Sequence, residues 1–379
     1  MRTLPRGPIP GRTVTLRDLT LDDIDGVVDA CNDLQTQRFL GRLPQPYTPD
    51  DARDWITNQI PSGWAAGQAG FAVTLTGDDR IAGSVGLGVP TADGHATSIG
   101  YWVAPWARGR GVATDATRTL ADWAFAQGFG RIELLTCPAN AASMRVALGA
   151  GFTHEGVRRA AALDRGGWTD MIVWVRLASD SGVPAPRALP DLPDGSLTDG
   201  VIRLTPVDES DADAMYALAS LPEVVATTVA SRAPTPESVA HRCATAPYKW
   251  LIGERAECAI RDAITGAFAG DIGLFREAPT GQGLIGYSLV REWRGRHFAT
   301  RAARLISDWA FDTAGLARLA AGTAPDNIAS QRTLERAGFQ REGYERGRLP
   351  SAGSTRVDNI PWAMLPGDRV VSPTRTTPR

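Results

Sequence analysis

The sequence predicts an α+β fold, with two tandem domains that each form a mixed, mostly antiparallel sheet with helices on both faces. The first observation is an internal repeat. The stretch IGYWVAPWARGRGVATDATRTLADWAF at 99–125 aligns without a gap with IGYSLVREWRGRHFATRAARLISDWAF at 285–311. The second is the succession of strand-like alternation and helical periodicity in each half. The chain has 379 residues, which is the length of two ordinary domains.

The repeat extends over a whole domain. TCPANAASMRVALGAGF at 136–152 matches TAPDNIASQRTLERAGF at 323–339, and the segment at 13–27 resembles the segment at 200–215. A period of this length is too long for a solenoid. The duplicated unit is therefore a complete domain.

The elements of the first half follow from local patterns. An alternating strand at 13–19 precedes a helix at 21–33, whose early acidic residues suit the helix dipole. A second helix at 48–60 opens with a Thr or Asp cap, and a helix over 108–128 follows a glycine-rich loop and ends at a glycine. Further strands are expected at 70–77, 80–89, 96–105, 131–138, 152–163 and 168–178, and a short helix at 140–151.

The domain boundaries follow from composition. The stretch 179–197 is rich in Pro, Gly, Ser and Asp without apolar periodicity, which is typical of a linker. We therefore expect domains at 1–178 and 198–369, and a disordered tail at 370–379.

Charge and cysteine content favour a cytoplasmic protein with small-molecule partners. The net charge is −2, which gives no electrostatic case for nucleic acid or a membrane surface. No apolar run reaches the roughly 18 residues of a membrane helix, and the N-terminus lacks a signal-peptide core. The four cysteines form no CxxC pair and have no His at metal-ligand spacing, so we expect free thiols and no metal site.

A glycine-arginine loop between a strand and a helix is the first candidate for chemistry. In RGRGVAT, Gly109 and Gly111 let the backbone approach a ligand closely, and Arg108 and Arg110 add guanidinium donors. The helix that follows presents unpaired N–H groups and the positive end of its dipole. The loop predicts a phosphate-binding site, although such a loop alone can also be a solvated turn.

The flanking motifs give the loop a more specific meaning. The segments 99–152 and 285–339 each resemble the GNAT superfamily of N-acetyltransferases, in which the signature [Q/R]-x-x-G-x-[G/A] is met by Arg108, Gly111 and Ala113. IGYWVAPWARGRGVAT, ADWAF, NAAS and GAGF resemble the RimJ/RimL branch, which acetylates protein N-termini and many small amines.

The resemblance implies acetyl-CoA as cosubstrate, lying where the strand that ends at Val103 splays from the strand at 131–137. Pantetheine would pair with backbone near Trp102 and Val103, and Asn140 would contact the CoA arm. Ser143 would protonate the departing thiolate, or alternatively it belongs to a helix cap. The pyrophosphate would sit on the loop and first helical turn, which comprise Arg108, Gly109, Arg110, Gly111, Ala113 and Thr114.

The general base is where the sequence departs from the family. Many relatives carry Glu just before IGY, whereas this chain has Ser98 and Leu284. Glu155 is the first substitute in the first half, with His154 and Asp170 as alternatives, although a carboxylate or His on a strand edge is usually a solvated side chain.

The second copy keeps most of the pattern but carries His297 where the first has Gly111. We expect the Cβ and imidazole to impair cofactor binding, while an outward-pointing His could be neutral or donate to phosphate. The positions that keep the cofactor pattern are Arg294, Gly295, Arg296, Ala299, Thr300, Asn327 and Ser330.

The predicted function is acetyl transfer from acetyl-CoA to a primary amine of a small molecule or a protein N-terminus, by direct attack, in the N-terminal domain. The alternatives are a non-catalytic CoA-binding sensor or scaffold, and an acyltransferase with another acyl-CoA. Trp102, Trp106 and Trp168 are candidates for an apolar acceptor site, although tryptophans more often pack in a core. We also expect the two domains to form an intramolecular pseudo-dimer, with a homodimer as a further option.

Overall fold

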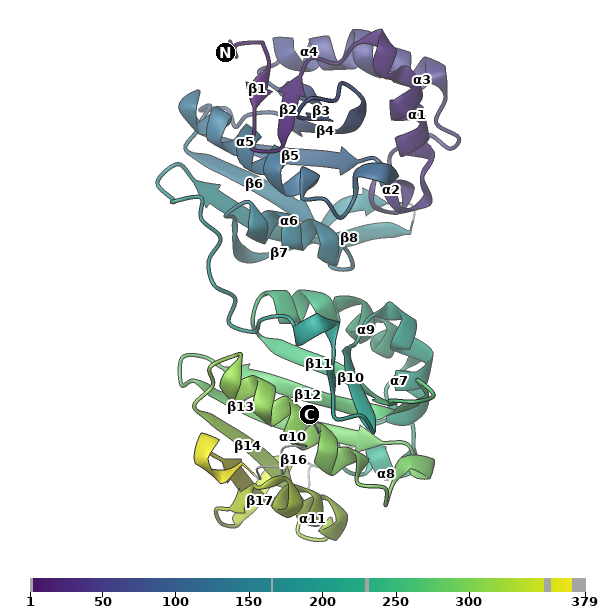
Figure 1. Cartoon of the computed structure of the whole chain (residues 1–379), viewed down its shortest axis with the longest axis vertical. Coiled ribbons are helices and arrows are strands. Elements are labelled where there is room, and N and C mark those ends of the chain that lie inside the picture. Colours follow the sequence, from purple (N-terminus) through teal and green to yellow (C-terminus); the bar gives the residue numbers. More distant parts are fainter. Residues whose placement is uncertain (1–2, 165, 229–231, 351–355, 370–379) are drawn as a thin grey trace, which may run out of the picture. The chain divides into compact units, whose positions relative to one another are not determined.

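The chain folds into two compact units, residues 1–186 and 187–379 (Figure 1). This computed structural model describes residues 3–164, 166–228, 232–350 and 356–369, so the predicted tail at 370–379 lies outside it. Each unit contains one mixed sheet, which confirms the predicted α+β class. The division falls inside the segment expected to be a linker, and Leu189 and Leu192 from that segment are buried in the core of the second unit.

The first unit contains an eight-stranded sheet in the order β1-β2-β3-β4-β5-β6-β8-β7. Neighbouring strands run antiparallel except β5 and β6, which are parallel. Its strands are β1 (Ile9–Pro10), β2 (Val14–Arg17), β3 (Ala69–Leu75), β4 (Ile81–Leu87), β5 (Ala96–Val103), β6 (Arg131–Thr136), β7 (Thr153–Asp164) and β8 (Gly167–Leu177). Its helices are α1 (Ile24–Asn32), α2 (Leu34–Phe39), α3 (Pro49–Asp54), α4 (Ile60–Ala65), α5 (Val112–Ala126) and α6 (Ala141–Gly149).

Helices cover both faces of this sheet. On one face, Val27 of α1 and Ala52 of α3 pack with Ala72 and Ile81 of the sheet. On the other face α5 lies against the central strands, and its Trp123 meets Phe71 edge-on at 5.7 Å between ring centroids.

The helix expected at 48–60 is longer than the sequence predicts. It runs from α3 through a π-helical stretch at Trp55–Gln59 into α4, and ends at Ala65. A proline at position 61 cannot donate its nitrogen and crowds the carbonyl four residues earlier, and a wider π turn relieves that crowding. The short α2, capped by Asp33, has no counterpart in the prediction.

The second unit contains a nine-stranded sheet in the order β15-β17-β14-β13-β12-β11-β10-β9, with β16 paired to β17. Only β13 and β14 pair in parallel within the described residues. Its strands are β9 (Leu197–Thr198), β10 (Ile202–Pro206), β11 (Arg255–Asp262), β12 (Phe268–Glu277), β13 (Gln282–Leu289), β14 (Arg318–Thr323), β15 (Gln340–Arg341), β16 (Glu345–Pro350) and β17 (Arg356–Met364). Its helices are α7 (Ala212–Ala219), α8 (Pro222–Val225), α9 (Pro236–Leu251), α10 (Phe298–Asp312) and α11 (Ile328–Ala337).

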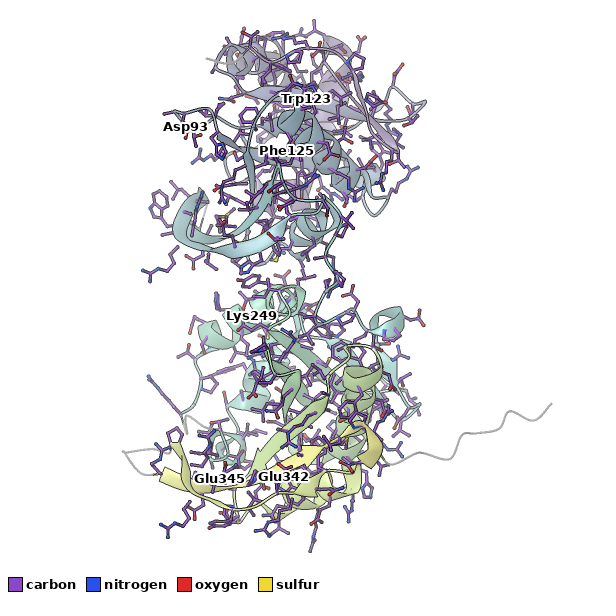
Figure 2. All side chains as sticks on the ribbon, turned by 90° about the vertical axis from the view of Figure 1, so that its left-hand side faces the viewer. Asp93, Trp123, Phe125, Lys249, Glu342 and Glu345 are labelled. Carbon is purple, nitrogen blue, oxygen red and sulfur yellow. The ribbon has the colours of Figure 1, made fainter. Side chains whose placement is uncertain are left out.

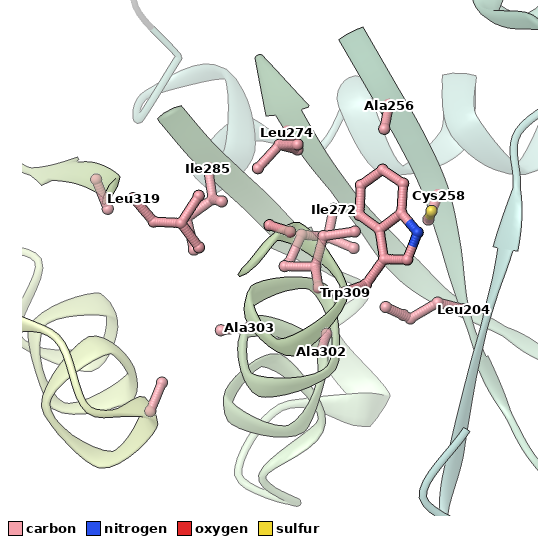
Figure 3. Packing of buried hydrophobic residues seen from close by; sticks show 14 of the residues in the cluster. Leu204, Ala256, Cys258, Ile272, Leu274, Ile285, Ala302, Ala303, Trp309 and Leu319 are labelled. Atoms are coloured by element: carbon pink, nitrogen blue, oxygen red, sulfur yellow. The ribbon is translucent and has the colours of Figure 1, made fainter. Parts of the chain in front are cut away.

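The second sheet also separates two apolar layers. Trp309 and Ala302 of α10 pack on the face that carries Cys258, Ile272 and Leu274 (Figure 3). On the opposite face α7 and α9 contribute a smaller cluster that includes Met215, Cys243 and Ala259. Polar side chains of the strands that point to this second layer, such as Glu257, are therefore held beneath α9.

Candidate active site

The two parallel strands of each unit part halfway along their length. In the first unit β5 and β6 pair only from Ala96 with Arg131 to Ile99 with Leu134. Beyond this point β5 stays paired with β4 as far as Val103, and β6 stays paired with β8. A gap with one free strand edge on each side results, as the resemblance implied.

The second unit repeats this geometry. There β13 and β14 pair from Gln282 with Arg318 to Leu284 with Ala320, whereas β13 continues beside β12 as far as Leu289 paired with Gly270.

The backbone groups that face the first gap belong to Tyr101 and Val103. On the side of β4, the Ser98 carbonyl accepts from the Gly88 N–H just beyond that strand, and the Ala104 N–H donates to the Ala82 carbonyl within it. Since backbone groups alternate sides along a strand, those of Trp102 also point to β4. Trp102 therefore does not offer its backbone to the gap, which corrects the sequence-based expectation.

The loop that follows β5 forms a cradle of N–H groups. Gly109 and Gly111 have left-handed φ values of 72° and 78°, and Gly111 is the N-cap of α5. Within the described structure, the backbone N–H groups of residues 109–114 have no acceptor, and the first amide bonded in the helix is that of Asp115 to the Gly111 carbonyl. Alternating left-handed residues turn successive amides into one concavity, which binds anions.

The second loop has the same shape in spite of its histidine. His297 is the N-cap of α10 and adopts φ 62° and ψ 13°, close to the 78° and 0° of Gly111. Gly295 is left-handed at 75°, and the N–H groups of residues 295–300 likewise have no acceptor in the described part of the unit. A Cβ built on Gly111 meets no atom within 4 Å, so a side chain fits at this position. The histidine therefore leaves the backbone shape of the second loop unchanged, and the expected impairment of cofactor binding stays a prediction.

Arg108 is engaged with protein groups. Its guanidinium donates to Asp33 at 2.5 Å, to Thr36 and Gln35 at 2.9 Å, and to the Val103 carbonyl at 3.3 Å. Burial acts to raise the pKa of Asp33, but the Arg108 hydrogen bond and its neighbours outweigh it and leave that pKa lowered. Arg108 ties the loop to α2.

Arg294 of the second unit likewise connects its loop to a short helix, but through a different carboxylate. It donates to the Leu289 carbonyl at 3.0 Å and to Glu223 on α8 at 3.1 Å. The second arginine of each loop differs more. Arg110 is exposed and makes no hydrogen bond or ion pair within the described residues, whereas Arg296 lies over the Trp293 ring at 5.1 Å from its centroid.

Asn140 and Ser143 form a helix cap next to the gap. The Asn140 side chain caps α6 by accepting the Ser143 N–H at 3.1 Å, and the Ser143 hydroxyl lies 2.7 Å from the Tyr101 hydroxyl. Burial raises the pKa of Tyr101 well above its ordinary value, so its phenol stays protonated. The phenol can therefore donate to Ser143 and leave the serine proton free for a third group.

The second unit builds an equivalent cap. Asn327 accepts the Ser330 N–H at 3.1 Å, and the Tyr287 hydroxyl lies 2.9 Å from Ser330 Oγ. Burial raises the pKa of Tyr287 to about 12. Sequence reasoning overlooked both tyrosines, although the Tyr of IGY is identical in the two copies.

Glu155 is not in position to act as the base. Its carboxylate accepts two hydrogen bonds from Arg131, at 2.9 and 2.5 Å, and these bonds lower its pKa. Arg131 begins β6, whereas the gap opens toward the other end of that strand. The second unit repeats the pair with Arg318 and Glu342; Figure 2 labels Glu342.

His154 and Asp170, the two alternative bases, also contact other groups of the protein. His154 packs edge-on against Trp174, with ring centroids 5.5 Å apart. Asp170 accepts the Ala160 N–H at 2.8 Å, where a bulge bends the β7–β8 hairpin. Asp358 accepts the Gly347 N–H in the corresponding hairpin.

The three tryptophans proposed for an acceptor site do not lie in one cluster. Trp102 packs against the apolar layer beneath α1 and α3, and Trp106 lies under the Arg80 guanidinium at 4.3 Å. Trp168 is 69% exposed near the tip of the β7–β8 hairpin.

No helix in the described ranges is both long and apolar enough to cross a bilayer.

Comparison with known proteins agrees with this geometry. A family model described as an acetyltransferase (GNAT) domain matches twice, at residues 13–153 and 202–340. A probable N-acetyltransferase of Bacillus subtilis is 37% identical over 84 residues, which cover 22% of this chain and 46% of that protein, less than half its length. An uncharacterized N-acetyltransferase of Bacillus licheniformis is 28% identical over 149 residues, which cover 38% of this chain and 82% of that protein.

Among solved structures, Mycobacterium smegmatis RimJ in complex with CoA-disulfide shares 23% identity, with a TM-score of 0.41 over 47% of this chain and 89% of that one. The family model covers most of the chain in two copies. The chain therefore belongs to the GNAT acetyltransferase family, with one copy of the family domain in each unit.

Proposed function

We propose that the chain transfers an acetyl group from acetyl-CoA to a primary amine of a small molecule or a protein N-terminus, by direct attack of the amine on the thioester. One observation carries the proposal. In each unit a parted pair of parallel strands opens beside six consecutive N–H groups that lack an acceptor within the described residues. An elongated ligand with a pyrophosphate at one end and an amide-containing arm fits both features.

Each group of the first site has a distinct task in this proposal. The amides of residues 109–114 hold the pyrophosphate, and the gap-facing backbone of Tyr101 and Val103 pairs with the amide-bearing arm. Arg108 holds the loop in shape through Asp33 rather than contacting phosphate itself. Acetyl-CoA, when bound, supplies an activated acyl group on a thiol leaving group.

Ser143 and Tyr101 serve the leaving group. The Ser143 hydroxyl protonates the departing thiolate, while the Tyr101 phenol donates to Ser143 Oγ from 2.7 Å and keeps the serine proton directed outward. Asn140 orients this serine by capping α6. The cap and the proton donor, which the sequence left as alternatives, are compatible in this arrangement.

We propose the first unit as the tighter-binding unit that performs transfer. Its Arg110 has no protein partner in the described ranges and can reach an anion, whereas Arg296 is held over Trp293. The second unit binds acyl-CoA through the equivalent amides, with Arg294, Gly295, Ala299 and Thr300 in the positions of the first loop and Asn327 and Ser330 in those of the cap.

The acceptor is proposed by analogy only. Proteins of similar fold include one described as a ribosomal-protein-S5-alanine acetyltransferase, so peptides with N-terminal alanine belong in the first panel of acceptors beside small amines. The test is release of CoA thiol from acetyl-CoA with that panel, in the full chain and in Gly109→Val. A β-branched residue is strained at the left-handed φ of 72°, so this substitution distorts the cradle.

Thiol release that depends on an amine and falls in Gly109→Val supports the proposal. Tight CoA binding without turnover on any amine would instead indicate a sensor or scaffold. Mass spectrometry of the ligand that co-purifies distinguishes acetyl from other acyl groups.

A further inference from the structure

A buried cluster of charges lies under α9 in the second unit. Glu257 on β11 is 1% exposed and contacts the guanidinium groups of both Arg242 on α9 and Arg255 on the same strand. Arg242 also reaches Asp271 Oδ2 on β12 at 3.2 Å. Burying charged side chains costs free energy even when they are paired, so ions placed in the interior of a domain call for a functional explanation.

Asp271 is the least satisfied member of the cluster. The 3.2 Å contact with Arg242 is its one hydrogen bond among the described residues, and its side chain keeps 14% of its surface exposed. One carboxylate oxygen is therefore left without a protein partner. Burial raises the pKa of Asp271 to about 6; Arg242 and Arg255 oppose this rise, and Glu257 adds to it. Cys243 of α9 and Tyr216 of α7 are further ionisable side chains packed in the same layer.

The position of Asp271 connects the cluster to the gap. Asp271 pairs with Ser288 on β13, and Ser288 lies past Leu284, the last residue of β13 that pairs with β14. Residues opposite each other in an antiparallel pair have Cα atoms about 4.5–5.5 Å apart and side chains on the same face. The carboxyl group thus lies one strand from the open edge, next to a small side chain.

The first unit has no such group at the equivalent place. There Ser84 pairs with Trp102, and the Ser84 hydroxyl is buried and donates to the Phe71 carbonyl at 2.8 Å. Trp102 packs against the apolar layer on that face. The partly buried carboxyl group beside the gap is specific to the second unit.

We propose that Asp271 is the proton acceptor of a second active centre, receiving the proton that a primary ammonium loses before its nitrogen attacks a thioester held between β13 and β14. This inference rests on the proposed function. The N–H bond breaks as the Asp271 O–H bond forms, directly or through a water. The amine nitrogen then bonds to the acyl carbon and the C–S bond breaks as the Ser330 hydroxyl gives its proton to the thiolate. Ser330 recovers a proton from the second N–H that the nitrogen loses, directly or through water, as the amide forms.

The cluster sets the pH range of this step. Only the carboxylate form accepts a proton, so the rate rises as pH increases through the Asp271 pKa of about 6 and then levels off. Removal of the Glu257 charge frees Arg242 for Asp271 and removes a repulsive neighbour. Both effects lower the Asp271 pKa, so the inflection moves to lower pH.

The experiment uses the full chain with the first loop blocked by Gly109→Val, and acetyl-CoA as the probe. Thiol release is followed from pH 5 to 8, with a panel of primary amines and also with water alone as acceptor, because hydrolysis requires the same proton acceptor. Asp271→Asn should lower the rate at saturating acetyl-CoA about 100-fold and abolish the inflection. Glu257→Gln should shift the inflection toward acid, and Asp271→Glu should recover part of the rate.

Calorimetry and a matched control separate this inference from the proposed function. Asp213→Asn, which alters an exposed carboxylate on α7, should leave both rate and inflection unchanged. If acetyl-CoA fails to bind the second unit, the proposed function of that unit fails as well. If acetyl-CoA binds but Asp271→Asn retains the inflection, or lowers the rate equally at every pH, Asp271 is not the proton acceptor.

Discussion

Exchange of the capping residue between the two loops tests whether this position controls cofactor binding. Either substitution alone, Gly111→His in the first unit or His297→Gly in the second, makes the two loops alike at this position. Both positions have left-handed backbone, with φ of 78° and 62°, and a Cβ at 111 meets no atom within 4 Å. The exchange therefore changes backbone strain and leaves the packing intact.

The magnitude follows from two opposing contributions. A left-handed backbone costs an L-residue about 1–2 kcal/mol, while replacing glycine removes about 0.4–1 kcal/mol of conformational freedom from the unfolded chain. Gly111→His should therefore lower the free energy of unfolding of the first unit by about 0–1.6 kcal/mol, and His297→Gly should raise that of the second by a similar amount.

The cradle of N–H groups survives in both variants, so acetyl-CoA affinity should change by less than about threefold, or about 0.6 kcal/mol. Calorimetry on the full chain measures each site separately when the other loop carries Val at Gly109 or Gly295. Urea unfolding of the same variants gives the stability change. A loss of more than about tenfold in Gly111→His, with folding intact, would refute the reasoning and show that a side chain here crowds the cofactor.

Three further substitutions test the roles assigned around the first gap. Asn140→Ala should destabilise the first unit by about 1 kcal/mol through loss of the α6 cap, as Asn327→Ala should in the second, measured by urea unfolding; an effect on acetyl-CoA affinity alone would contradict the cap. Ser143→Ala should lower kcat of the first unit about 100-fold with little change in acetyl-CoA affinity, and Ser330→Ala, the matched control, should not affect that unit. Glu155→Gln should leave kcat and its pH profile unchanged, because the carboxylate is ion-paired away from the gap; loss of the acidic limb of the rate profile, where the rate rises with pH, would restore it as the base.

The sequence was sufficient for the features that depend on local pattern or on the repeat. Glycines at 109 and 111, an arginine on either side of the first, and a following amphipathic segment predict a loop and a helix N-terminus. The same motif in the second half predicts the same site there. The α+β class follows from the order of these elements.

Features that depend on tertiary pairing were out of reach. The partner of Arg108 is Asp33, 75 residues away on a short helix that the sequence did not reveal. Asp271 reaches the gap only through its register with Ser288, and register cannot be derived from one strand alone. The conformation of His297 was also out of reach, because an average backbone preference disfavours a side chain here, yet histidine is among the residues enriched in the left-handed region and the fold holds it there. Its effect on cofactor binding is what the exchange of Gly111 and His297 measures.

Calorimetric titration of the full-length chain with acetyl-CoA tests most directly whether each unit carries a complete binding site. The duplicated gaps and cradles predict two sites per chain, of which Gly109→Val removes one and Gly295→Val removes the other. A single site that Gly109→Val abolishes and Gly295→Val leaves untouched would contradict the account, because the second unit would then have the shape of a site without its function.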